Sequence, residues 1–196
     1  MLTQLSTIKT RLAITVTTYD AILTNAIKGV SVRFDKETNR TLARATGITE
    51  EFSGDETEIL LSRYPIEAVA KFELKSNETE GWIEQTGIDY LIRRACVISL
   101  SQPLNYQFSS VNSPLARVTF TGGYVLPGDT VGAGQTALPD DLEQAAVEQV
   151  AAWFQTRDVL GLIRNRPWQG TYQQYAQLDL LPNVKVVLTR YERWAI

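Results

Sequence analysis

The spacing of apolar residues predicts two long amphipathic helices on either side of the middle of the chain. Within residues 20–40 the apolar positions have the spacing of a helix with one face in a core: Ile22, Leu23, Ala26, Ile27, Val30 and Phe34. Thr17 and Asp20 fit a capping arrangement at its start, and a shorter helix is expected around residues 6–12. The second long helix begins after Pro139, and its apolar face carries Leu142, Ala145, Ala146, Val150, Trp153 and Phe154. We expect these two faces to pack against each other.

Between the helices the period changes to two, which predicts strands. The clearest alternation sets Ala68, Ala70, Phe72 and Leu74 against Val69, Lys71, Glu73 and Lys75. Further strands are expected at 59–62, 90–93 and 96–100, and the alternation around Val118 and Phe120 predicts a strand that stops at Gly122 and Gly123. The predicted fold class is α+β: a mainly helical core of long N-terminal and C-terminal helices, with an inserted small antiparallel β section at about 57–124.

A glycine-rich loop joins the last of these strands to the second long helix. Its glycines do not have the spacing of a dinucleotide-binding fingerprint, and no Gly-Lys-Ser/Thr sequence of a P-loop is present. The following helix starts with Asp140 and Asp141, whose carboxylates would repel a phosphate. Turn formation is therefore favoured over nucleotide binding, and no cofactor is expected.

The residue inventory removes most familiar catalytic mechanisms. The 196 residues include no histidine and a single cysteine, which excludes the Ser-His-Asp triad, Cys-His catalysis and histidine-based metal sites. Cys96 lies in an apolar run, where a small buried hydrophobic residue is expected. Chemistry by carboxylates alone stays open, but the acidic residues fall mainly in surface-like segments. We expect neither an enzyme nor a bound metal.

Charge and hydropathy narrow the expected partners. The net charge of -3 and the scattered lysines and arginines argue against a protein that grips DNA through its phosphates. The apolar runs are too short to cross a bilayer, and the first residues lack the pattern of a secretory signal. We therefore expect a protein that is made in a cytoplasm, without a membrane partner.

The C-terminal segment is apolar although it lies beyond the last predicted core helix. Its sequence is LLPNVKVVLTRYERWAI, in which Pro182 prevents a helix from running through that point and the valines are typical of an extended or briefly helical segment. Such a segment either folds back on its own domain or inserts into a neighbour. We accordingly divide the chain into a domain at 1–170 and an extended C-terminal tail at 171–196.

The segments along the chain are, in order, the helix, the β insert, TFTGGY, a variable loop, LPDDLEQAAVEQVAAWFQTRD and LLPNVKVVLTRYER. This order of segments resembles that of the head-tail connector, or adaptor, proteins of tailed bacteriophages. The resemblance extends from about Leu12 to Arg193, and the β region and loops are longer than in compact members of the family. It implies a structural virion protein that forms a ring, typically dodecameric, on the portal protein. Such a ring extends the DNA channel and offers a platform to the next neck or tail protein.

The resemblance also implies where the protein acts and what it contacts. It places the protein in the neck of the virion, assembled in the host cytoplasm, with DNA passing through the lumen without tight binding. The alternative is another neck component, such as a head-closure or tail-completion protein.

Two sets of residues are expected to make these contacts. The portal-binding set is Leu180, Leu181, Pro182, Val184, Val187, Leu188, Arg190, Tyr191, Arg193 and Trp194. The set expected to contact a neighbouring subunit or partner is Gly122, Gly123, Tyr124, Gly128, Gly132 and Gly134.

Overall fold

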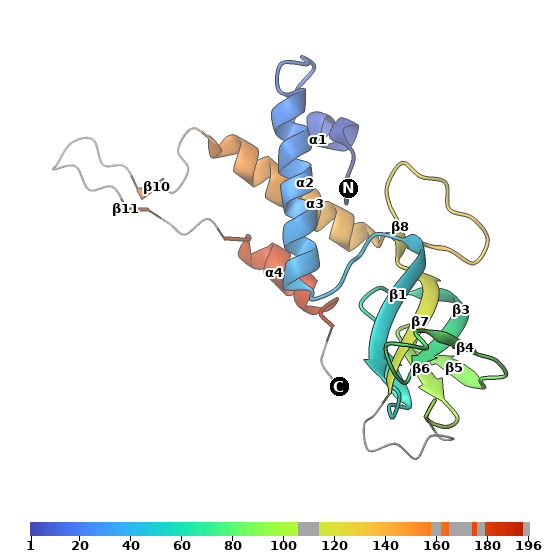
Figure 1. The fold of residues 1–196 in the computed structure, drawn as a ribbon. Helices are drawn as coiled ribbons and strands as arrows, with labels where there is room; N and C mark the ends of the chain where they lie inside the picture. The colour runs from blue at the N-terminus through green and yellow to red at the C-terminus, as the bar shows by residue number, and fades with distance from the viewer. Residues whose placement is uncertain (106–113, 158–161, 165–173, 176–178, 194–196) are drawn as a thin grey trace. The chain divides into compact units, whose positions relative to one another are not determined.

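The computed structural model describes residues 1–105, 114–157, 162–164, 174–175 and 179–193 (Figure 1). The chain forms two compact units. A helical unit comprises residues 1–38 and 138–192, and a β unit comprises residues 39–137 together with the end of the chain from Arg193. The β unit is thus an insertion in the sequence of the helical unit.

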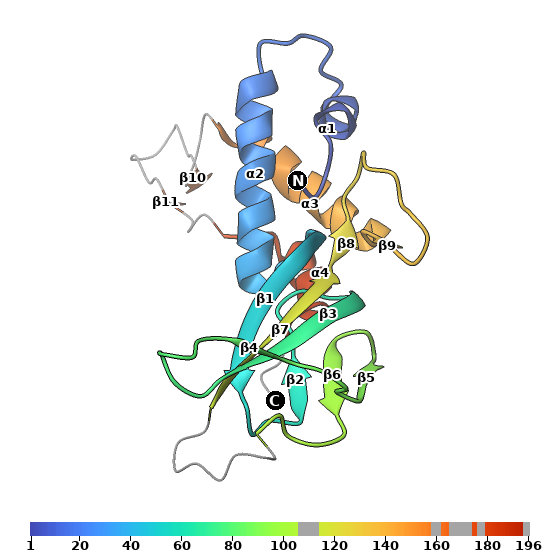
Figure 2. The same ribbon diagram turned by 45° about the vertical axis from the view of Figure 1, so that its right-hand side comes forward.

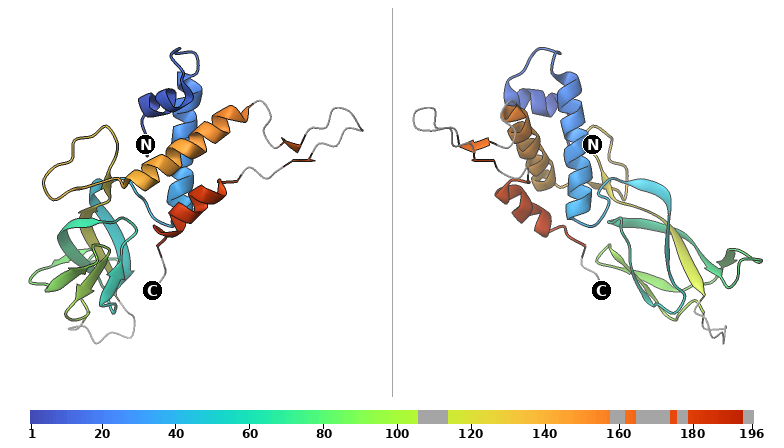
Figure 3. Two further views of the ribbon diagram at one scale, coloured as in Figure 1. Left: turned by 180° about the vertical axis from the view of Figure 1, so that it is seen from behind. Right: turned by 60° about the vertical axis from the view of Figure 1, so that its left-hand side comes forward.

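The helical unit is built around α3. Its helices are α1 (Leu5–Leu12), α2 (Asp20–Glu37), α3 (Asp140–Gln155) and α4 (Pro182–Thr189). Each of the other three helices contacts α3, which lies against α2 in both views of Figure 3. The packing of α2 on α3 confirms the expected pairing, with Phe34 and Val150 fully buried. Two short strands, β10 (Leu162–Arg164) and β11 (Gln174–Tyr175), form a separate antiparallel ladder.

Three details of the expected helical core were wrong. Ile22 is 50% exposed, because the buried stripe of α2 starts one position later at Leu23. Trp153 is only partly buried, since it lies at the rim of the interface beside Gly29. Asp20 does not cap α2 through its side chain; its carboxylate instead accepts a hydrogen bond of 2.7 Å from Lys9 Nζ.

The β unit contains two larger sheets that enclose a core of their own. The four-stranded sheet has the order β1 (Ala45–Ser53), β7 (Leu115–Gly122), β3 (Ile66–Lys75) and β4 (Ile83–Gln85). The three-stranded sheet has the order β2 (Glu58–Leu60), β6 (Val97–Leu100) and β5 (Tyr90–Arg93). All neighbours in both sheets are antiparallel (Figure 2). The buried core joins residues of both sheets, among them Phe52, Phe72, Val118, Phe120, Ile98 and Leu100.

Bulges in β3 change which side chains face this core. Phe72 and Leu74 are buried, but Ala68 and Ala70 are exposed, contrary to the expected single apolar face. The register against β7 shifts between Val69 and Lys71, so Ala70 is an extra residue that reverses the alternation. Val69 therefore takes the inward position before the bulge and packs against the core.

The predicted fold class was wrong. In the part of the chain that the structure describes there are four helices, the longest of 18 residues, beside antiparallel sheets that form a unit with its own core. The prediction undercounted strands because β1 (ATGITEEFS) carries few apolar residues and a register shift near its start. The C-terminal segment is also not wholly extended. Pro182 occupies the first turn of α4, where its missing N–H costs nothing.

The outer face of the four-stranded sheet carries a row of charges centred on β7. Arg117 lies opposite Glu51 of β1 and Glu73 of β3. Its guanidinium donates hydrogen bonds of 2.7 and 2.9 Å to the two carboxylate oxygens of Glu73, and Lys71 Nζ lies 3.1 Å from the same carboxylate. The Trp82 ring lies over the Arg117 guanidinium at 4.3 Å, and Glu73 is buried. Hydrogen bonding from Arg117 above all, and then from Lys71, lowers the pKa of Glu73 to about 2.

This pairing predicts how stability depends on pH. Because the folded-state pKa of about 2 is below the usual 4.5, ionised Glu73 stabilises the fold above about pH 4.5, and the contribution is lost as the pH falls towards 2. Glu73→Gln should lower the free energy of unfolding of the β unit by about 2 kcal/mol at pH 7. In urea unfolding this difference from wild type should shrink between pH 4.5 and 2. The matched control is Glu84→Gln, an exposed carboxylate opposite Glu73 on β4, whose effect should stay small. If Glu73→Gln lowered the free energy of unfolding equally at pH 4.5 and at pH 2, the lowered pKa of Glu73 would be contradicted.

Candidate functional site

The apolar side chains of the expected portal-binding set hold α4 against its own subunit. Leu180, Val184 and Leu188 are buried, and α4 packs on α3. The backbone N–H of Leu181 donates a hydrogen bond of 2.8 Å to the side-chain oxygen of Gln149, a glutamine that is 1% exposed in the apolar face of α3. The start of α4 is therefore fixed by a buried polar contact as well as by apolar burial.

The remaining members of the set form the accessible side of this segment. Pro182 and Arg190 are exposed, and Leu181, Val187, Tyr191 and Arg193 are partly exposed. The Tyr191 hydroxyl donates a hydrogen bond of 2.6 Å to Asp141, and the Arg193 guanidinium donates to the carbonyl oxygen of Leu60. Trp194 lies outside the described residues.

A charged cluster reinforces the loop that leads into α4. Lys185 donates a hydrogen bond to Asp179, and Arg33 of α2 lies 3.5 Å from the same carboxylate. The hydrogen bond from Lys185, followed by that from the Leu180 backbone N–H, lowers the pKa of Asp179. The contacts of this segment thus come from both α2 and α3.

The glycine-rich region divides into a buried base and an exposed tip. Gly122, Gly123 and Tyr124 are buried. A Cβ on Gly122 would lie 2.8 Å from the carbonyl oxygen of Pro65, and one on Gly123 would lie 2.7 Å from that of Ala43. Gly123 also has φ of +101°, a conformation that favours glycine. These two glycines are required for close backbone packing within the β unit.

The tip extends beyond a short parallel ladder between β8 (Tyr124–Val125) and β9 (Thr136–Ala137). Gly128, Gly132 and Gly134 are exposed, and a Cβ added at Gly134 would have no neighbour within 4 Å. Inside the tip, the Gly132 N–H donates a hydrogen bond of 2.8 Å to the side chain of Gln135. Of the six residues expected to contact a neighbour, the three glycines of the tip are therefore accessible.

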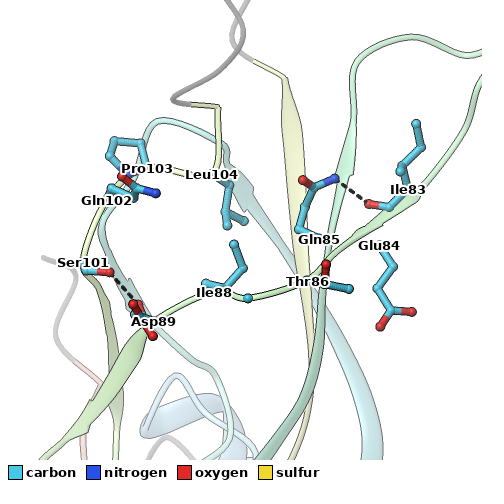
Figure 4. A pocket seen from close by; sticks show the side chains of 11 residues that line it. Ile83, Glu84, Gln85, Thr86, Ile88, Asp89, Ser101, Gln102, Pro103 and Leu104 are labelled. Atoms are coloured by element: carbon cyan, nitrogen blue, oxygen red, sulfur yellow. Dashed lines mark hydrogen bonds between the residues drawn. The ribbon is translucent and has the colours of Figure 1, made fainter.

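An open pocket of about 450 Å³ lies in the β unit between residues 83–89 and 101–104. The side chains of Ile88 and Leu104 point towards each other within it (Figure 4). The Ser101 hydroxyl donates a hydrogen bond of 3.0 Å to the backbone carbonyl of Asp89, so it has no side-chain base as its acceptor. Within the described residues, no group of three or more Cys, Asp or Glu side chains could hold a metal ion.

Sequence reasoning missed an apolar strand edge in the β unit. Tyr90, Leu91 and Ile92 of β5 are all exposed, Leu91 to 66%. The available signal was the run of apolar residues without alternation, which is unusual in a strand that covers one core. Cys96, just before β6, is partly exposed rather than buried as expected.

No described helix is long and apolar enough to cross a membrane.

No family model and no curated protein matches this chain. Solved structures do share its fold. The neck of an empty GTA (gene transfer agent) particle with C6 symmetry aligns with a TM-score of 0.56 and 14% identity, over 98% of this chain and 90% of the other. The neck of a native GTA particle with C12 symmetry gives 0.51 and 16%, over 90% and 85% of the two chains. The virion of the native particle gives 0.50 and 16%, over 92% and 81%. At these identities the similarity shows a common fold.

The two classes of glycine predict different effects of adding a methyl group. Gly123→Ala should lower the free energy of unfolding by about 2–4 kcal/mol, because the added Cβ overlaps the backbone at Ala43 and φ is positive. Gly134→Ala, which has φ of +77° but open space around it, should cost about 1 kcal/mol. Denaturant unfolding of the two variants checks the difference. Equal costs would show that Gly123 is not a packing position.

Proposed function

We propose that this protein is a structural component of the neck of a phage-like particle, specifically an adaptor that forms a ring on the portal vertex. The observation that carries the proposal is the fold similarity to GTA neck and virion structures, which extends over 90–98% of the chain and so includes both units. The protein then acts in the virion neck after assembly in the host cytoplasm. It serves as a scaffold and not as an enzyme, as the similarity to structural virion particles suggests.

A ring of twelve copies is the arrangement we favour. The similar necks are described with C6 and C12 symmetry, and twelve equivalent copies satisfy both. The ring would surround the DNA channel below the portal and present its far side to the next neck or tail protein. The exposed loop tip with Gly128, Gly132 and Gly134 would contact a neighbouring subunit or that partner.

Portal docking would use the accessible side of α4 and the residues that follow it. Leu180, Val184 and Leu188 hold the helix in place, so an outward contact would use members of the set that stay accessible, among them Val187 and Arg190. Arginine and tyrosine are frequent anchors of interfaces, and Arg190 would pair with portal carboxylates. A second candidate is a head-closure or tail-completion protein. The burial of the apolar stripe of α4 within its own subunit favours it, because such a protein needs no portal-docking tail.

Electron microscopy of the protein mixed with portal protein tests the role. We expect rings on the tail-facing side of the portal, and Arg190→Glu should weaken attachment by at least about tenfold. The control Lys36→Glu, an exposed charge reversal at the end of α2, should attach like wild type. Truncation after Pro182 is less informative, because it also removes Val184 and Leu188 from the helical core.

Each outcome separates the candidates. The head-closure role would be favoured by one pair of results: no rings form on the portal alone, but rings form on a preassembled complex of portal and adaptor from the same particle. Rings that are unaffected by Arg190→Glu would leave the adaptor role in place and exclude Arg190 as the docking contact.

The lumen of such a ring should not hold DNA tightly. With a net charge of -3 and scattered lysines and arginines, the protein has no concentrated set of cations to displace the counterions condensed on DNA. We expect dissociation constants weaker than roughly 1 µM in gel-shift assays at physiological salt, and a strong decrease of binding with added salt. Nanomolar affinity under these conditions would overturn this part of the proposal.

A further inference from the structure

We propose that the free edge of β5 pairs with the free edge of β1 in a second copy of this chain. Both strands are terminal in their sheets, whose orders are β1-β7-β3-β4 and β2-β6-β5. Each therefore presents backbone N–H and C=O groups that have no partner strand in the described part of the chain. The inference rests on the proposed ring, to which it assigns a lateral contact.

The two edges lie on opposite sides of the β unit, as Figures 1 and 2 both show. At one side β1 neighbours the end of β2, since the Glu50 carboxylate accepts a hydrogen bond of 2.9 Å from the Ser62 N–H. At the other side β5 neighbours β3, since the rings of Tyr90 and Phe72 meet edge to face at 5.5 Å. A cyclic ring requires two different, complementary surfaces on each copy, and this placement provides them.

The β5 edge is short and ends in Arg93, but its centre, Leu91 and Ile92, carries no charge or proline of the kind that protects free edges in monomeric proteins. Its residues are all exposed, and the register against β6 places Leu91 and Arg93 on the outer face, because their partners Ser99 and Val97 alternate with the buried Ile98 and Leu100. An exposed leucine at the centre of a free edge invites strand pairing, whereas inward charges, proline or a covering loop prevent it. Burial of this leucine is what a pairing partner would provide.

The chemistry of β1 matches that of β5. The outer face of β1 carries Thr49 and Glu51, both exposed, opposite Thr119 and Arg117 of β7. If β1 of one copy paired with β5 of the next, Glu51 would lie beside Arg93 on the outer face, and the small Thr49 would lie beside Leu91. Arg93 already contacts Glu58 at 3.1 Å, but both side chains are at least half exposed, so this bond is readily exchanged. The acidic edge of one copy and the basic, apolar edge of the next favour a copy of the chain over an unrelated partner.

Disulfide trapping tests the contact directly, because outer-face neighbours on paired strands lie within bridging distance. In a Cys96→Ser background, Leu91→Cys is combined with Thr49→Cys or with Glu51→Cys, which covers two registers on the same face. Under mild oxidation in the presence of portal protein, at least one combination should give a covalent ladder of dimers, trimers and higher species. Leu91→Cys with Val32→Cys is the control, since Val32 is 55% exposed on α2 and belongs to neither edge.

Charge reversal provides a second, independent measurement. Arg93→Glu and Glu51→Lys should each weaken self-association by about tenfold, and the two substitutions in one chain should restore it. All these positions are exposed, so circular dichroism should show folded variants.

The outcomes distinguish this inference from the proposed function. Rings on the portal without a ladder and without a charge effect would overturn the strand pairing and leave the neck role in place. A ladder and charge rescue without rings on the portal would support the pairing and count against the adaptor role. A chain that stays monomeric at its highest soluble concentration, alone and with portal, would overturn the pairing.

Discussion

Backbone pairing where the chain enters and leaves the β unit is the constraint on which the rest of that unit depends. Tyr124 N–H donates a hydrogen bond of 2.8 Å to the Leu42 carbonyl, and Arg44 N–H donates one of 2.8 Å to the Tyr124 carbonyl. The two passages can approach this closely because Gly123 has no Cβ. The first and last segments of the β unit are thus bonded to each other. For this reason the insertion connects α2 to α3 without forcing the end of α2 far from the start of α3.

The same constraint determines what the glycine-rich loop can do. Once Gly122, Gly123 and Tyr124 are committed to the base, the loop is free only beyond the β8–β9 ladder. Arg40 adds to the base, since its guanidinium lies 3.3 Å from the Tyr64 ring and 5.3 Å from the Tyr124 ring. The exposed tip therefore extends from a well-packed base, which limits the number of conformations that it would lose in contacting a neighbour.

Periodicity predicted the elements whose burial is one-sided and regular, such as α2, α3 and β7. Periodicity failed where contacts with residues distant in sequence determine the local structure. The bulge at Ala70 depends on the register against β7, and the placement of α4 depends on Gln149, a polar residue whose acceptor is used by a backbone N–H 32 positions later. The candidate site followed the same rule. Sequence identified the glycines and the apolar tail, but only contacts with residues distant in sequence show which of them belong to the fold.

The two units form separate compact bodies, and under the proposed function their surfaces would make different contacts. The apolar stripe of α4 is buried within the helical unit, so an outward contact there would rely on a few polar residues. Such a contact suits attachment to a protein other than a copy of this chain. The β unit leaves backbone edges and an apolar strand exposed, which suits repeated contact between identical copies. Because the cores are independent, a change at a strand edge need not disturb the helices. Lateral assembly and docking would then be adjustable separately.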